Sequence, residues 1–192
     1  MNAMKRLPAV GLMLLAGACA TTEFAGPPTA FRMSSPGLPD NAMLAQRHAG
    51  NLKSNPNCLG ENVAPPLQWS HAPEKTRSFA LLFHDQAGRG GLGVTHAVVY
   101  GIPAHVTSLA EDELGAAPKD GRFVAGKNTL GIQYPGPCPP RGNAPQHYVM
   151  TLIATDLEPA ALPPGLSKDD VLKTLQGGKA LRAASLAFRY AH

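Results

Sequence analysis

Glycine and proline interrupt this chain so often that only short regular elements fit between them. The 192 residues include 20 glycines and 19 prolines, which are spread along the chain without a repeat. Glycine favours turns and proline ends or kinks a helix, so loops should be abundant and long helices few. The length suits one domain with a proper core. The sequence therefore predicts a single, turn-rich domain.

Several segments have the length of strands. One is a continuous apolar run and two others alternate between apolar and polar residues, which buries one face of a strand. Because alternation has a period of two, His96 should share a face with Val98 and Tyr100. The expected strands cover residues 78–84, 94–100, 147–155 and about 185–190.

One helix is well signalled near the C-terminus. Ser167 can cap its start, and Asp170 stands at the reciprocal position of a capping box. Gly177 and Gly178 would end it. Many strands with one late helix predict a β-rich α+β fold, and this class alone leaves the function open.

The first twenty residues resemble an export signal. Lys5 and Arg6 precede an apolar run from Leu7 to Leu15, which is too short to span a bilayer as a helix. The segment that ends at Cys19 resembles a bacterial lipobox, in which that cysteine becomes lipidated. The segment Ala18-Cys19-Ala20 also satisfies the A-x-A rule of ordinary signal peptidase, so both kinds of cleavage remain possible.

We predict a lipoprotein-type signal peptide over residues 1–19, a tether over residues 20–30 and one domain over residues 31–192. The protein would then reside in the periplasm, anchored by lipid to a bacterial membrane. Cleavage by ordinary signal peptidase would instead leave it soluble in the periplasm or secreted. The net charge of +4 includes two charges of the signal, and no basic cluster follows. Nucleic acid is therefore not expected as a partner.

Short motifs follow one another in the middle of the chain. Their order and spacing resemble the phosphatidylethanolamine-binding protein family, which includes Raf kinase inhibitor protein. The resemblance extends from about Phe31 to Tyr190, and it implies a large antiparallel sheet packed with a smaller sheet, with helices near the C-terminus. The motifs are Gly60–Trp69, Phe79–Asp85, Thr95–Ala97, Tyr134–Pro140 and Gln146–Tyr148.

In the family these motifs outline one small polar pocket. A histidine donor, oriented by a carboxylate and helped by main-chain N–H groups, would hold a phosphate, sulfate or carboxylate. Because proline has no N–H, the main-chain donors of the last loop would be Gly136 and Cys138. The resemblance implies the ligand-binding residues Asp85, His96, Tyr134, Gly136, Cys138, Pro139, Gln146 and His147.

The chain departs from the family pattern at several pocket positions. The second aspartate of the family's loop is Ala87, and the tryptophans beside the histidine are missing. Gln146 takes the place of a second pocket histidine, and His147 takes that of an arginine. A one-residue shift would bring His147 into the pocket instead. The lost charges should weaken anion binding and make it depend on pH through the histidines.

Cysteine usage suggests a disulfide. Export places the domain in an oxidising compartment, where cysteines tend to pair. With Cys19 assigned to the lipobox, Cys58 and Cys138 remain, each beside a motif loop. A disulfide between them would join the two loops; the alternative is two buried free thiols.

The function that follows is that of an exported, non-enzymatic binding or inhibitor-like protein without cofactor or metal. Its partners would be a small phosphate- or carboxylate-bearing ligand, a membrane through the lipid anchor, and a kinase or protease as a protein target. One alternative is a structural envelope lipoprotein with a vestigial pocket. Another is a metal-dependent hydrolase, although two of its four ligands are adjacent on a strand and so point to opposite faces. Those ligands would be His84, Asp85, His96 and His147.

Overall fold

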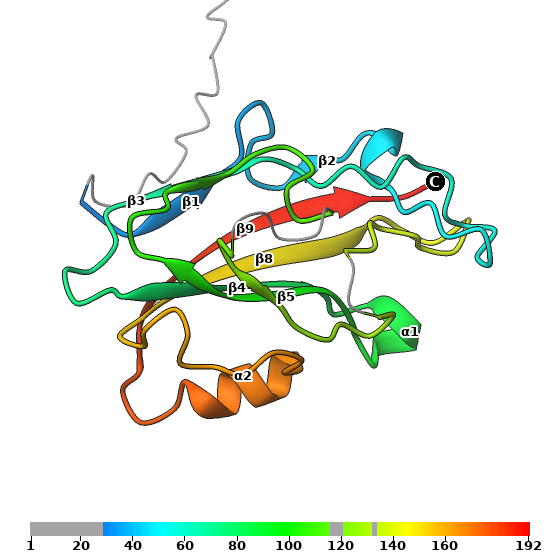
Figure 1. The fold of residues 1–192 in the computed structure, drawn as a ribbon. Coiled ribbons are helices and arrows are strands. Elements are labelled where there is room, and N and C mark those ends of the chain that lie inside the picture. The colour runs from blue at the N-terminus through cyan, green and yellow to red at the C-terminus, as the bar shows by residue number, and fades with distance from the viewer. Residues whose placement is uncertain (1–28, 116–120, 132–133) are drawn as a thin grey trace, which may run out of the picture.

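The computed structural model describes residues 29–115, 121–131 and 134–192. The predicted signal peptide with Cys19, and all of the predicted tether before Thr29, lie outside the described residues. Within them, a large sheet lies between a small sheet on one side and a helix on the other (Figure 1). The predicted β-rich α+β fold with two packed sheets is confirmed.

Nine strands and three short helices form the described part of the chain. In chain order they are β1 (Arg32–Ser34), β2 (Ala42–Met43), η1 (Gln46–His48), β3 (Leu67–Ser70), β4 (Ser78–Asp85), α1 (Gly88–Gly91), β5 (Val94–Pro103), β6 (Ser108–Leu109), β7 (Val124–Ala125), β8 (Gln146–Thr155), α2 (Lys168–Thr174) and β9 (Ala180–Tyr190).

The large sheet has the strand order β2-β9-β8-β4-β5-β7, and the small sheet has the order β1-β3-β6. The pairs are antiparallel except for β2 with β9, which run parallel. The last strand begins at Ala180, earlier than expected, because β9 pairs along the whole length of β8. Two of the three longest strands, β5 and β8, flank β4, and the third, β9, pairs with β8.

Both faces of the central strand β4 are buried. One packs on the small sheet, where Trp69 meets the ring of Phe79 edge-on, with 5.5 Å between ring centroids. Phe31 stacks on the same ring, with 6.0 Å between ring centroids. The N-terminal part of the described chain therefore lies beside the start of β4. The opposite face packs on α2 through Val171 and Leu82. Such two-sided burial explains the continuous apolar run of β4.

The predicted helix begins with the predicted capping box. The Ser167 hydroxyl accepts the N–H of Asp170 at 3.2 Å, and the Asp170 carboxylate accepts the N–H of Ser167 at 3.0 Å. Gly177 and Gly178 follow with positive φ, as expected of residues that end a helix. The helix prediction is confirmed.

The expected alternation along β5 fails at His96. Phe83 pairs with Ala97 but His84 pairs with Thr95, so His96 is the extra residue of a β-bulge. Val98 and Tyr100 point toward α2, whereas the ring of His96 lies 5.3 Å from that of Phe83 on the other face. The bulge therefore turns His96 away from the face that strict alternation assigned to it.

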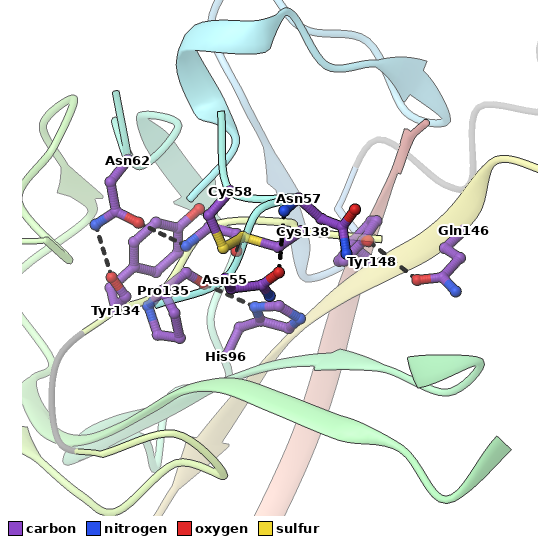
Figure 2. Close-up of a disulfide and its surroundings, with 11 residues drawn as sticks. Asn55, Asn57, Cys58, Asn62, His96, Tyr134, Pro135, Cys138, Gln146 and Tyr148 are labelled. Atoms are coloured by element: carbon purple, nitrogen blue, oxygen red, sulfur yellow. Dashed lines mark hydrogen bonds between the residues drawn. A yellow bond between two sulfur atoms is a disulfide. The ribbon is translucent and has the colours of Figure 1, made fainter. Parts of the chain in front are cut away.

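The predicted disulfide between Cys58 and Cys138 is present, with the two Cα atoms 4.8 Å apart (Figure 2). It joins the segment of residues 50–62 to the Gly/Pro loop, which we define as Tyr134–Pro140. The N–H of Gly50 also donates to the carbonyl of Pro137 at 2.9 Å. The two segments are thus joined covalently and through the main chain.

The side chain of Asn62 also holds the Gly/Pro loop in place. Its amide donates to the carbonyl of Tyr134 at 2.8 Å, and its oxygen accepts the N–H of Gly136 at 2.7 Å (Figure 2). Asn62 itself adopts the left-handed region at φ 64°, which asparagine tolerates better than most residues. The Gly60–Trp69 motif therefore serves to hold the Gly/Pro loop.

Gly136 has no room for a side chain. A Cβ there would collide with the carbonyl of His48 and lie 2.8 Å from the nitrogen of Gly50. We expect Gly136→Ala to lower the free energy of unfolding by about 3 kcal/mol, since main-chain atoms cannot move aside cheaply. Gly142→Ala is the control, because it meets nothing within 4 Å and has only the strain of φ +82°, about 1 kcal/mol. Equal losses in urea unfolding would contradict the close packing at Gly136.

The disulfide closes a long loop, because its cysteines are 80 residues apart. We expect Cys58→Ser/Cys138→Ser to lower the free energy of unfolding by about 2–4 kcal/mol. Denaturation of the oxidised wild type, the reduced wild type and the double variant measures this, and the last two should agree. Mass spectrometry that finds two free thiols in protein from an oxidising compartment would contradict the pairing.

Candidate functional site

A pocket of about 240 Å³ lies at the end of the large sheet where β4 ends and β5 and β8 begin. This is the end of the molecule that carries α1 in Figure 1. The Gly/Pro loop and the segment before Cys58 complete its wall. The lining consists of Asn55, Asn57, Asp85, Gly88, Arg89, Val94, His96, Leu130, Gly136, Cys138, Pro139, Pro140, Gln146 and Tyr148.

His96 forms part of the pocket with its ring almost fully buried, at 4% exposure. Its Nδ1 lies 2.7 Å from the carbonyl of Pro135, and since a carbonyl only accepts, Nδ1 carries the proton. Nε2 has no hydrogen-bond partner among the residues that the structure describes. Burial lowers the pKa of His96 to about 4, against the weaker effect of the Pro135 bond. The ring is therefore neutral at pH 7, and its Nε2 is an acceptor rather than the expected donor.

Asp85 both shapes its loop and faces the pocket. Its carboxylate accepts the N–H of Ala87 at 2.9 Å, which makes the turn after β4. The residue is only 2% exposed, and burial raises the pKa of its carboxyl, although main-chain donors at Ala87 and Gly88 act against this. The carboxylate makes no hydrogen bond to His96, which is oriented by the Pro135 carbonyl. Asp85 thus adds a second acceptor to the pocket.

Strand alternation along β8 decides between Gln146 and His147. Gln146 is 9% exposed and lines the pocket beside Tyr148, whereas His147 is exposed and is not part of the lining. The hydroxyl of Tyr148 donates to Oε1 of Gln146 at 3.2 Å. The amide nitrogen of Gln146 thus remains as a donor for the pocket. The structure places Gln146 in the pocket lining and His147 outside it, because neighbouring strand residues face opposite sides.

The Gly/Pro loop contributes fewer groups to the pocket than expected. Gly136, Cys138 and Pro139 line the pocket, but the N–H of Gly136 is taken by Asn62. The ring of Tyr134 stacks on that of Phe83 at 5.8 Å and is not part of the lining. Tyr134 therefore supports the loop from the core and does not border the pocket.

Three polar lining residues were missed from the sequence. Arg89 follows Asp85 by four residues, in a left-handed conformation at φ 54°, and its exposed side chain brings a cation to the rim. Its position in the loop that follows Asp85 could have indicated that it borders the pocket. Asn55 and Asn57 reach the pocket because the disulfide holds their segment there (Figure 2). Their position next to Cys58 could have suggested this.

Metal-ligating side chains are dispersed in the described part of the chain. Within residues 29–115, 121–131 and 134–192, no three His, Cys, Asp or Glu side chains come close enough to share one ion. In the same ranges, no helix has both the length and the apolar character needed to cross a bilayer.

Comparisons with known proteins identify the family. The family model described as phosphatidylethanolamine-binding protein matches residues 34–191. The UPF0098 protein of Aquifex aeolicus is 37% identical over 134 residues, which are 69% of this chain and 77% of that protein. The LppC protein of Mycobacterium tuberculosis, whose name describes it as a lipoprotein, is 42% identical over 110 residues, which are 55% of this chain and 51% of that protein.

A solved structure supports the same assignment. The crystal structure of Escherichia coli YbcL, described as a member of the mammalian PEBP family, superposes with a TM-score of 0.74 at 31% identity. The match covers 84% of this chain and 98% of that chain. The resemblance seen in the ordered motifs is therefore confirmed. The chain belongs to the phosphatidylethanolamine-binding protein family.

Proposed function

We propose that the protein is an exported, non-enzymatic binding protein whose pocket holds a small phosphate- or carboxylate-bearing head group. The observation that carries this proposal is the combination of Arg89 at the rim with the buried amide of Gln146 in one pocket of about 240 Å³. A guanidinium and an amide nitrogen both donate to anionic oxygens. The name of the family model supports a phosphate head group as the ligand.

The chemistry of the lining favours binding over turnover. Acyl or phosphoryl transfer through the protein would need a nucleophile activated by a base. The hydroxyl of Tyr148 donates to Gln146, and burial raises the pKa of Tyr148 far above neutral. The sulfur of Cys138 is in the disulfide. For a metal-dependent hydrolase, His84 and Asp85 point to opposite faces of β4 and His147 is outside the pocket.

The binding proposal is tested by titration calorimetry with O-phosphoethanolamine at neutral pH. We expect wild type to bind and Arg89→Ala to bind roughly five- to tenfold more weakly, because a charge-assisted hydrogen bond at the rim is lost. Arg182→Ala is the control: it removes the same charge from the start of β9, far along the sheet from the pocket.

Three outcomes would count against the proposal. No measurable binding to folded wild type would favour a structural lipoprotein with a vestigial pocket. Equal weakening by the two arginine variants would show a general charge effect. Steady release of phosphate from the ligand would overturn the non-enzymatic part.

We further propose that Cys19 is lipidated and holds the protein on a membrane that faces the periplasm. The lipobox-like sequence before Cys19 and the relative named as a lipoprotein support this. We expect wild type in the membrane fraction and Cys19→Ser in the soluble fraction. If Cys19→Ser stays in the membrane fraction at the size of wild type, the anchor proposal fails.

A further inference from the structure

Nε2 of His96 is a buried acceptor to which no described residue donates a hydrogen bond. Nδ1 of His96 is used by Pro135, and Nε2 is buried on the other edge of the ring with no partner (Figure 2). Leaving a buried polar atom unpaired costs free energy, so such atoms are normally satisfied by protein, water or ligand. Because His96 lines the pocket, a bound ligand can supply the missing donor.

The pocket also separates its acceptors from its cation. His96 and the Asp85 carboxylate are both buried, whereas Arg89 is exposed at the rim. A fully ionised anion would satisfy Arg89 and the Gln146 amide, but it would place its own lone pairs against those of His96. An anion that carries a proton on one oxygen would satisfy Arg89, the Gln146 amide and Nε2 of His96 together, while the Asp85 carboxylate already accepts the N–H of Ala87.

We infer that the pocket selects an anion that donates a hydrogen bond to Nε2 of His96, and that its ligand class is the monoprotonated phosphomonoester. This inference rests on the binding function proposed above and specifies its ligand. A phosphomonoester keeps one P–OH below its second pKa, which is about 6. A phosphodiester has a single negative charge as well, but no P–OH. The two esters therefore differ in the donor and not in charge.

Few ionisable groups around His96 change charge near neutral pH, so the protonation of the ligand is a main source of the pH dependence of binding. The pKa of His96 lies at about 4, and burial raises those of Tyr134 and Tyr148, so none of these changes charge near neutral pH. Asp85 has a raised pKa and faces the same pocket, so it can add its own pH dependence. The charged or titratable neighbours on the elements packed there are Asp85, Arg89, Tyr134, Tyr148 and, from the opposite sheet face, His84 and His147.

The test compares methyl phosphate with dimethyl phosphate by calorimetry between about pH 5.5 and 7.5, a range that spans the monoester's second pKa. We expect methyl phosphate to bind about twentyfold more tightly at the lower pH, because the fraction that carries P–OH rises by that factor. Dimethyl phosphate should bind at least about tenfold more weakly than methyl phosphate at the lower pH. Any pH dependence that dimethyl phosphate shows measures the protein's own groups, Asp85 included.

A variant and a spectroscopic measurement isolate His96. In His96→Asn, the amide can still donate to Pro135, but the Nε2 acceptor is gone, so the two esters should bind alike. Two-bond 1H–15N spectra of wild type should show Nε2 without a proton at neutral pH, and its signal should shift when methyl phosphate binds. A protonated Nε2 in the free protein would overturn the inference, whether or not the variant folds.

The outcomes separate this inference from the proposed function. Equal binding of both esters by wild type would overturn the donor requirement and leave the anion site in place. Tighter binding of methyl phosphate at the higher pH would also overturn it. Failure of both esters and of O-phosphoethanolamine to bind would overturn the proposed function itself.

Discussion

The amide of Asn62 is the interaction on which the site depends most. It donates to the carbonyl of Tyr134 and accepts the N–H of Gly136, so it fixes the main chain on both sides of Pro135 in a loop that is rich in proline. Prolines have no N–H, and such a loop cannot satisfy itself through the main chain. Pro135 is placed between the two contacts, and its carbonyl in turn sets the tautomer of His96. A side chain 34 residues earlier in the sequence than His96 therefore helps to determine which nitrogen of the ring carries the proton.

The charged Arg89 and the neutral His96 differ in how far they are buried in the pocket. The charge of Arg89 lies at the rim, where water screens it and where a buried cation's desolvation cost does not arise. His96 lies in the interior, where burial favours the neutral ring. The family's arginine and second pocket histidine are absent from this chain, and Arg89 brings a positive charge to the pocket from a different loop. The pocket does not need a charged histidine.

Much of the fold followed from local patterns. The strands, the Ser167 capping box and the inward position of Gln146 obey periodicity and propensity, and the structure has them. His96 shows the limit of this reasoning, because a β-bulge adds one residue and reverses the face without any mark in the sequence. Arg89 and the two asparagines were missed for another reason. Loop geometry and a disulfide, and not strand period, bring them to the pocket.

The stacking of Phe31 on Phe79 also fixes the distance between the N-terminal part of the domain and the pocket. Phe79 stands near the beginning of β4 and Asp85 at its end, and six residues of strand span about 20 Å. Whatever precedes Phe31 is therefore attached at the opposite end of the sheet from the pocket mouth. A domain tethered upright at its N-terminal end would turn that mouth toward the aqueous compartment. If the protein carries the lipid proposed at Cys19, the pocket in that orientation would meet diffusing solutes before the lipids of the membrane that holds it.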